Sequence, residues 1–424
     1  MNQPLSRYVD YMYSYPHKTA YRPFPAPVSL LPYLEQLQGR KASLYFHIPF
    51  CSHKCGYCNL FSLQTNRTEY IATYLDTLHR QAQQLSPLTA GLTFDSFAIG
   101  GGTPLLLTVP QLEQLMATAA LFGVHPSHAF TSVETSPEYA DRPRLNVLKK
   151  AGVSRVSIGI QSFQDEELKA IKRRPRQNTI YQALDDIRQM DFPYFNIDLI
   201  YGIKGQTVES FLYSLEEALR FQPNELFIYP LYVRQGTGIT EREPDDVCFR
   251  MYRVACKLLQ AKGFLQTSMR RFIHHPSTDA EVSCGDEVML SCGSGGRSYL
   301  GDLHYATRYT VCQQCIAREI DEYMATTDFT VARNGFILSA KEQQQRFIIK
   351  NLMYYMGIDK AEYTRRFGEP LDRTPLFRQL AEQYWIEETP ERIRLTPEGL
   401  GYSDYIGQLF ITPEIRQLME TYSY

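Results

Sequence analysis

The sequence lacks the features that would place the protein in a membrane or on a nucleic acid. No apolar run reaches 18 uninterrupted residues, so we expect no transmembrane helix. The formal net charge is only −2, and bulk charge therefore favours neither a nucleic-acid partner nor a membrane partner. Residues 1–25 carry neither the basic end nor the apolar block of a signal peptide, which predicts a cytoplasmic protein.

The composition is that of an ordinary globular protein. The chain has 424 residues, of which 44% are hydrophobic and 21% are charged. This length predicts two or three domains with a large apolar core. Disulfides are rare in the cytoplasm, so the clustering of several of the nine cysteines indicates metal binding or catalysis.

Short β-rich runs alternate with amphipathic helical stretches from about residue 41 onward. The expected strands span 43–48, 94–100, 130–135, 155–160, 194–200 and 225–230. Between them, apolar residues recur at spacings of three and four, as a one-sided buried helix requires. Successive units of this kind predict an α/β fold with a parallel sheet, an incomplete (β/α)6 barrel that is short of the eight units of a closed one.

The chain divides into four expected segments. Residues 1–40 are predicted to be an extended, proline-containing arm, and residues 41–240 the core barrel. Residues 241–335 are less periodic and are expected to complete the barrel on its substrate side. In residues 336–424 a helix pair, a short strand hairpin and a last helix predict a helical, winged-helix-like domain.

Three cysteines lie within "HIPFCSHKCGYCNLFS", residues 47–62. The C-x3-C-x2-C spacing of Cys51, Cys55 and Cys58 suits three corners of an iron–sulfur cubane whose fourth iron stays open. A zinc site completed by His47 or His53, or three unrelated thiols, would also satisfy this loop, although zinc motifs usually pair two CxxC units.

Residues with ligand-binding character follow the expected strands one after another. The cysteine loop follows the first strand, and the glycine run 100–102 follows the second. Glu134 ends the third strand, Gln161 ends the fourth, and Asp198 lies near the end of the fifth. Ligands bind at this edge in parallel α/β folds, so these residues are predicted to form one site.

The chain resembles radical S-adenosylmethionine (radical SAM) enzymes, in the branch of anaerobic coproporphyrinogen III oxidase and its haem-chaperone relatives. The matching stretches are "YFHIPFCSHKCGYCNLF", "GGGTP", "ETSP", "GVSRVSIGIQSFQDEELKAIKR", "NIDLIYG" and "RLTPEGLGYSDYIGQLF". This resemblance implies a [4Fe–4S] cluster on Cys51, Cys55 and Cys58, with SAM on its open iron. Reductive cleavage of SAM would give a 5′-deoxyadenosyl radical that abstracts hydrogen from a substrate.

The same resemblance implies a set of SAM contacts on the first two strands. Tyr45 would pack near SAM, and a core tyrosine is its alternative interpretation. Gly101, Gly102 and Thr103 would approach the methionyl amino group, because glycine lets a ligand come close to the backbone.

Further contacts are implied on the next three strands. Glu134 would accept hydrogen bonds from SAM unless it is merely solvated, and Gln161 and Arg173 would contact ribose and carboxylate. Arg173 lies in "KRRPR", so a solvated run of charge is its alternative. Asp198 interrupts an apolar strand and needs a ligand hydroxyl or a cation as partner. We assign catalytic roles to Glu134, Asp198 and Tyr45.

Two departures from the family pattern bear on the reaction. Leu60 stands where the porphyrin oxidases carry a further cysteine, and Lys204 stands where a proline is usual. Both argue against literal coproporphyrinogen decarboxylation. We expect an oxidoreductase acting on an organic substrate, with a tetrapyrrole foremost, and reduced flavodoxin or ferredoxin as electron donor. The alternatives are a radical methyltransferase that uses a second SAM and a non-catalytic haem chaperone.

A second group of candidates lies in the less periodic part of the chain. Zinc or an auxiliary cluster could bind to a further set of thiols, namely Cys284, Cys292, Cys312 and Cys315. Buried free cysteines are common, and this is the alternative interpretation. Haem iron in a carrier could use a histidine among His274, His275 and His304, although the pattern favours ordinary core or surface histidines. The stretch 291–302 is expected to line the substrate side.

Overall fold

A run of parallel strands forms the centre of the protein. The computed structural model describes residues 7–9, 14–124, 129–174, 176–274, 288–371 and 375–423. The parallel strands lie in the spatial order β12 (Val288–Cys292), β2 (Lys41–Ile48), β5 (Thr93–Gly101), β6 (Phe130–Thr135), β7 (Arg155–Gln161), β8 (Tyr194–Tyr201) and β9 (Glu225–Pro230). All six strands predicted from the sequence are present, and the α/β fold is confirmed.

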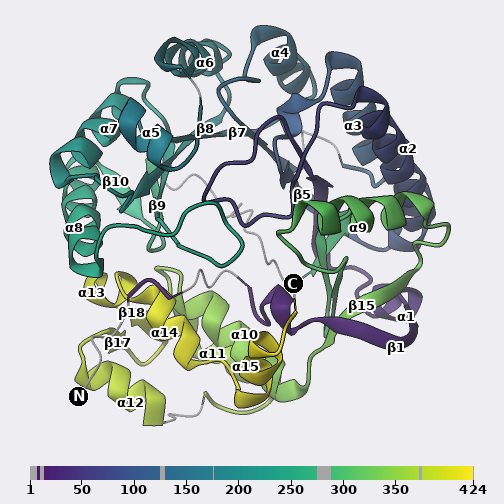
Figure 1. Ribbon diagram of the computed structural model, residues 1–424. Coiled ribbons are helices and arrows are strands. Elements are labelled where there is room, and N and C mark those ends of the chain that lie inside the picture. Colours follow the sequence, from purple (N-terminus) through teal and green to yellow (C-terminus); the bar gives the residue numbers. More distant parts are fainter. Residues whose placement is uncertain are drawn as a thin grey trace.

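Helices surround the outer face of these strands (Figure 1). In chain order they are α2 (Thr68–Leu85), α3 (Val109–Ala120), α4 (Arg142–Lys150), α5 (Asp165–Ala170), α6 (Gln177–Gln189), α7 (Val208–Arg220) and α8 (Asp245–Ala261). Side-chain caps begin several of them: Asp141 accepts from the N–H of Arg144 at 3.1 Å before α4. The alternation brings the carboxyl ends of all the parallel strands to one edge.

Antiparallel strands extend the sheet on both sides to 13 strands in all. On one side lie β11 (Arg271–His274) and β10 (Phe264–Gln266), and on the other lie β13 (Arg297–Leu300), β14 (Leu303–Ala306), β15 (Val331–Ile337) and β1 (Arg22–Ser29). β1 pairs with β15 and is an edge strand, which is where the prolines of "RPFPAPVS" are tolerated. The remaining elements before residue 338 are α1 (Leu31–Gln36), β3 (Phe50–Cys51), β4 (Leu63–Gln64), α9 (Gln313–Ala325) and 3-10 turns at Lys18–Ala20, Ser86–Thr89 and Pro104–Leu106.

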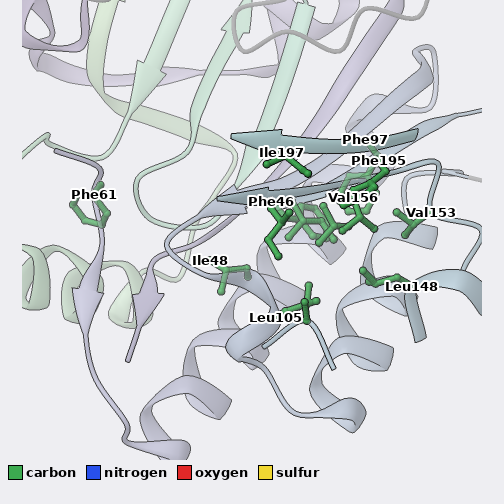
Figure 2. Packing of buried hydrophobic residues seen from close by; sticks show 14 of the residues in the cluster. Phe46, Ile48, Phe61, Phe97, Leu105, Leu148, Val153, Val156, Phe195 and Ile197 are labelled. Atoms are coloured by element: carbon green, nitrogen blue, oxygen red, sulfur yellow. The ribbon is translucent and has the colours of Figure 1, made fainter. Parts of the chain in front are cut away.

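Side chains on the parallel strands alternate between the helix-covered face and the inner face. Figure 2 shows Phe46, Phe97 and Val156 gathered between the strands and the helices. Phe46 and Phe97 are at most 1% exposed, and their ring centroids are 5.0 Å apart. Successive side chains on a strand point to opposite faces. Tyr45, next to Phe46 on β2, and Asp198, next to Ile197 on β8, therefore face the inner side, where the site lies.

The C-terminal part packs around a hydrophobic cluster of its own. Its elements are α10 (Ala340–Leu352), β16 (Ile358–Asp359), α11 (Lys360–Phe367), α12 (Pro375–Glu382), β17 (Ile386–Glu388), β18 (Arg392–Leu395), α13 (Pro397–Leu400), α14 (Ser403–Leu409) and α15 (Pro413–Glu420). The predicted helical C-terminal domain is confirmed. Tyr15 and Ala20 of the N-terminal segment also pack into this cluster. The division into four segments stays a prediction.

No helix in the described part of the chain is both long enough and apolar enough to cross a lipid bilayer.

Candidate active site at the carboxyl ends of the parallel strands

A cavity of about 450 Å³ opens at the carboxyl ends of the parallel strands. The structure brings together around it all the residues assigned from the sequence: Tyr45, Cys51, Cys55, Cys58, Gly101, Gly102, Thr103, Glu134, Gln161, Arg173 and Asp198. They come from the ends of five strands and from the loops that follow them. The predicted location of the site therefore corresponds to a real cavity, and the role of each residue remains a prediction.

The cysteine loop is held in place by contacts at both its ends. β3 pairs in parallel with β4, which brings the start and the end of the loop side by side. The N–H of Gly56, in the middle of the loop, donates to the carbonyl of Ile171 at 2.9 Å. Phe50 is fully buried and packs edge-on against Tyr74, with ring centroids 5.0 Å apart. These contacts hold the loop against β4, α2 and the end of α5.

The three thiols of the loop are half-buried and form no disulfide. Each meets a different polar side chain: Thr103 Oγ1 lies 3.6 Å from Cys51 Sγ, Arg173 Nη1 lies 3.5 Å from Cys55 Sγ, and Ser62 Oγ lies 3.8 Å from Cys58 Sγ. Burial raises the pKa of Cys51 to about 12, and burial also raises the pKa of Cys58. Such thiols lose their protons readily only when a metal cation binds beside them.

The three thiols suit a [4Fe–4S] cluster better than a single metal ion. In the described part of the chain, no three His, Cys, Asp or Glu side chains are grouped so as to hold one ion. A cubane needs no such grouping, because each thiolate binds a different iron. The histidines considered as zinc ligands are engaged with backbone carbonyls: His47 Nε2 lies 2.9 Å from Phe61 O, and His53 Nε2 lies 2.8 Å from Lys172 O.

His47 supports Tyr45 from the same strand. Its Nε2 faces the carbonyl of Phe61 and must carry the proton, so its Nδ1 accepts from the Tyr45 hydroxyl at 3.1 Å. Burial lowers the pKa of His47 to about 4, which keeps the ring neutral. A Cβ on Gly101 or Gly295 would lie 2.8 or 2.7 Å from this ring. The sequence missed this supporting role, although the two-residue spacing on one strand face could have indicated it.

The glycine run 100–102 serves packing within the protein as well as access for a ligand. A Cβ on Gly100 would lie 2.7 Å from the Glu134 carboxylate, and one on Gly102 would lie 2.5 Å from the Phe50 carbonyl oxygen. Gly101 has a φ of +116°, which favours glycine, and its N–H lies 3.4 Å from Glu134 Oε2. The run therefore allows both the cysteine loop and Glu134 to approach β5.

Two carboxyl groups share the inner face of the sheet. Solvent in the cavity reaches Glu134, yet the surrounding protein raises its pKa, while the N–H of Gly101 acts in the opposite direction. Burial raises the pKa of Asp198 to about 7; the Asn196 amide, at 2.8 Å, opposes the rise, and the charge of Glu134 adds to it. Near neutral pH Asp198 can therefore either donate or accept a hydrogen bond.

Arg173 stands in the cavity wall and not in a solvated run of charge. Its guanidinium donates to the Gly159 carbonyl and, at 3.2 Å, to the Tyr57 hydroxyl, besides its contact with Cys55. Its Nε is buried and has no hydrogen-bond partner among the described residues. Gln161 has a φ of +75° next to a register shift between β7 and β8, and this places its amide over Gly159.

A further part of the cavity carries a basic–aromatic lining, of which the sequence indicated only Arg297: Lys18, Tyr229, Tyr232, Arg234, Arg297 and Tyr309. Lys18 Nζ lies 3.6 Å from the ring centroid of Tyr309, and the Arg234 guanidinium lies 5.2 Å from that of Tyr232. Arg297 belongs to the stretch 291–302 that was expected on the substrate side. Lys18 lies in a 3-10 turn, Tyr229 in β9 and Arg297 in β13, whereas the other three lie in loops. No local motif marks them.

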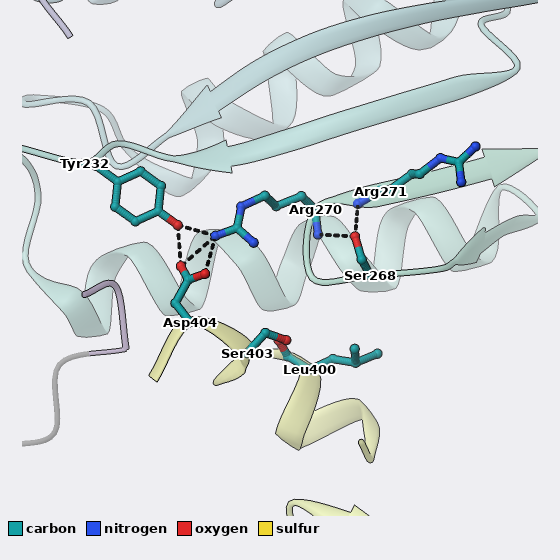
Figure 3. A network of polar contacts seen from close by, with 7 residues as sticks. All are labelled: Tyr232, Ser268, Arg270, Arg271, Leu400, Ser403 and Asp404. Atoms are coloured by element: carbon teal, nitrogen blue, oxygen red, sulfur yellow. Dashed lines mark hydrogen bonds and ion pairs between the residues drawn. The ribbon is translucent and has the colours of Figure 1, made fainter. Parts of the chain in front are cut away.

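A buried ion pair connects this lining to the C-terminal domain (Figure 3). Arg270 and Asp404 have side chains that are 5% and 1% exposed, and an Arg270 Nη2 to Asp404 Oδ2 bond of 2.6 Å joins them. The Tyr232 hydroxyl donates to Asp404 and accepts from Arg270, while Tyr232 itself lines the cavity. Asp404 lies in "RLTPEGLGYSDYIGQLF", so this motif reaches the cavity through Tyr232.

Of the histidines considered as haem ligands, the two that the structure describes, His274 and His304, do not line the cavity. His304 is fully buried in β14 with its ring centroid 4.5 Å from that of Tyr299, and burial lowers its pKa. His274 lies in β11 and packs on Phe264 with ring centroids 4.3 Å apart. His275 lies outside the described residues.

The four cysteines of the second group occupy different environments. Cys292 is fully buried in β12, and burial raises its pKa. Cys312 and Cys315 lie together at the start of α9, nearer the surface. Cys284 lies outside the described residues.

Family comparisons identify both parts of the chain. Residues 45–218 match the Radical SAM superfamily, and residues 338–401 match the HemN C-terminal domain. The chain is 31% identical over 394 residues to the oxygen-independent coproporphyrinogen III oxidase of Salmonella typhimurium, covering 85% of this chain and 83% of that protein.

The chain is also 27% identical over 386 residues to the haem chaperone HemW of Bacillus subtilis, covering 87% of this chain and 100% of that protein. The solved structure of HemN from Escherichia coli superposes with a TM-score of 0.82 at 23% identity, over 95% of this chain and 97% of that one. This last similarity supports the fold.

Proposed function

We propose that the protein is a radical SAM oxidoreductase, because the chain belongs to the radical SAM superfamily, in the branch that contains HemN and HemW. Members of this superfamily use a [4Fe–4S] cluster and SAM. The proposed reaction is reductive cleavage of SAM followed by hydrogen abstraction from a bulky organic substrate. A tetrapyrrole is the first candidate for that substrate.

Each part of the cavity has a role in this proposal. The three cysteines of the loop would hold the cluster, and Arg173, which lines the cavity beside Cys55, would contact an oxygen atom of SAM. When bound, the cluster and SAM supply a 5′-deoxyadenosyl radical. Tyr45, oriented by His47, would pack against SAM, while Glu134 and Asp198 would hydrogen-bond its polar groups.

The observation that carries the proposal is the continuity of one cavity from the cysteine loop to the basic–aromatic lining. Guanidinium and ammonium groups bind carboxylates well, and tyrosine rings pack on flat apolar surfaces. A tetrapyrrole with acidic side chains combines these two properties. Leu60, 44% exposed, also lines this cavity and contributes no further metal ligand.

Anaerobic reconstitution with iron and sulfide tests the proposal. We expect about four irons per chain and, with dithionite and SAM, release of 5′-deoxyadenosine measured by mass spectrometry. We expect reduced flavodoxin or ferredoxin to support the same release of 5′-deoxyadenosine when it is supplied in place of dithionite. Cys55→Ala should lose most of the iron, whereas Cys256→Ala, a half-buried cysteine of α8, should keep it. An intact cluster that never yields 5′-deoxyadenosine would contradict the oxidoreductase, and S-adenosylhomocysteine as co-product would favour the methyltransferase alternative.

A haem chaperone is the second candidate, and the similarity to HemW over that protein's full length favours it. In that case haem titration should give a Soret band while SAM stays intact. Because His274 and His304 lie away from the cavity, a haem ligand among them would be insensitive to loss of the cluster. Loss of the Soret band in His274→Ala, both with and without the cluster, would support a haem chaperone that uses this histidine. A Soret band that His274→Ala keeps would contradict a haem ligand at this position.

A further inference from the structure

The pair Cys312 and Cys315 has no part in the proposed reaction. Cys312 is the N-cap residue of α9 and is exposed, and Cys315 lies partly exposed in the first turn of that helix. Their side chains contact each other. A Cys-x-x-Cys pair in this position can close a disulfide within one helical turn.

The surroundings of the two sulfurs differ. Backbone N–H groups at the start of α9, first that of Cys315, lower the pKa of the Cys312 thiol without forming a full capping hydrogen bond. The Cys315 thiol and the charge of Lys54 act in the same direction. The contact with Cys312 in turn raises the pKa of Cys315. Cys312 is therefore the better nucleophile of the two, and Cys315 keeps its proton.

The pair is fixed against the cysteine loop. Gln313 directly follows Cys312 and is the first residue of α9. Its side chain accepts a hydrogen bond from the N–H of Gln64 and donates one to the carbonyl of Ser62, both at 2.8 Å. Lys54 donates to the carbonyl of Val311 at 2.9 Å. The start of α9 is thus held at the surface with its exposed sulfur accessible.

The geometry does not favour a metal at this pair. Within the described ranges, no third His, Cys, Asp or Glu side chain joins the two thiols in a possible metal site. Cys292 is fully buried in β12. Structural zinc sites need four ligands, so two thiols alone are poor candidates.

We propose that Cys312 and Cys315 form a reversible dithiol–disulfide pair that exchanges with low-molecular-weight disulfides such as oxidised glutathione. The Cys312 sulfur attacks one sulfur of the incoming disulfide, forming a mixed disulfide and releasing one small thiol. The Cys315 sulfur then attacks Cys312 Sγ, closes the internal disulfide and releases the second thiol. The two protein thiols lose two electrons and two protons, and the small disulfide takes them up as two thiols.

Thiol trapping on the cluster-loaded full chain tests this inference. The protein is equilibrated anaerobically in glutathione buffers of increasing oxidation, alkylated and digested, and the peptides are weighed by mass spectrometry. We expect a disulfide between residues 312 and 315 that forms and disappears reversibly with the buffer. Cys256 is the internal control, because burial raises its pKa to about 12 and it should stay reduced.

Single variants test the order of attack. Cys315→Ser should accumulate glutathione on Cys312, whereas Cys312→Ser should take up glutathione on Cys315 at least about tenfold more slowly. The same comparison is repeated with Cys51, Cys55 and Cys58 replaced by alanine, so that loss of the cluster cannot supply the reacting thiols. Equal rates in the two single variants, absence of the internal disulfide at every buffer ratio, or stoichiometric zinc on the pair would overturn the inference.

Discussion

At the scale of single residues, Asp198 couples the site to pH. It occupies the inner face of β8, where burial and the neighbouring Glu134 raise its pKa to about 7 and the Asn196 amide opposes the rise. An unfolded aspartate titrates near 3.9, so the folded protein binds the extra proton between about pH 4 and pH 7. Folding is therefore less favourable above this window than below it.

Asp198→Asn should remove this contribution. The free energy of unfolding of the wild type should fall, relative to that of the variant, as the pH rises from about 4 to about 7, and then level off. Urea denaturation of the cluster-free proteins at pH 5 and pH 8 measures the difference. Parallel pH curves for the two proteins would show that Asp198 is not protonated in the folded state.

Gly102→Ala should disturb the cysteine loop. The new Cβ would lie 2.5 Å from the carbonyl oxygen of Phe50, the residue before Cys51, so the backbone must move. We expect a loss of stability of about 1–3 kcal/mol and reduced iron content after reconstitution. Gly123→Ala is the control: it has open space at its Cβ and suffers only from its φ of +70°. Full iron retention in Gly102→Ala would argue against a rigid loop.

At the scale of elements, the ion pair between Arg270 and Asp404 joins α14 to the main sheet. Arg270→Met would leave the Asp404 charge buried without its cation, which typically costs about 3–5 kcal/mol. The double variant Arg270→Met/Asp404→Leu should recover part of this loss, because no unpaired charge remains. Chemical denaturation of both proteins measures the coupling.

The exposed pair Arg394–Glu387 is the matched control for this experiment. Its side chains are 52% and 47% exposed, so Arg394→Met should cost less than about 1 kcal/mol. If Arg270→Met proved equally mild, the network in Figure 3 would contribute little to joining the two parts.

The regular elements were predictable because their pattern is local. In "RVSIGI" apolar residues alternate with small or polar ones, and β7 indeed directs Ser157 and Gly159 into the cavity. The residues at the cavity rim were found because they end successive strands. β13 and β14 were missed, since apolar spacing in that stretch follows no single period. Lys18 and Arg234 were missed because only the tertiary fold brings basic residues that are isolated in the sequence to the cavity.

At the scale of the whole molecule, the described residues form two hydrophobic clusters, one under the main sheet and one in the C-terminal domain. Residues within a cluster stabilise one another, and separate clusters can open independently. Ile406 is fully buried in the second cluster, and Ile197 is fully buried in the first.

Ile406→Ala should lower stability by about 2–5 kcal/mol and act mainly on its own cluster. Hydrogen exchange followed by mass spectrometry should show faster exchange in residues 340–420 while β5 to β8 stay protected. Ile197→Ala should give the reverse pattern. Equal acceleration in both regions would mean that the protein unfolds as one cooperative unit.

The two kinds of residue around the cavity come from different stretches of the chain. The thiols and the rim residues lie between positions 45 and 198, whereas the basic–aromatic lining lies before position 41 or after position 198. Under the proposed function, mutations in the second set would alter which molecule is accepted without altering how the reaction is started. Relatives that share the thiols and the rim residues would then differ in substrate specificity through changes in the basic–aromatic lining. Chimaeras joined near positions 41 and 198 would exchange substrate preference and keep the same initiating chemistry.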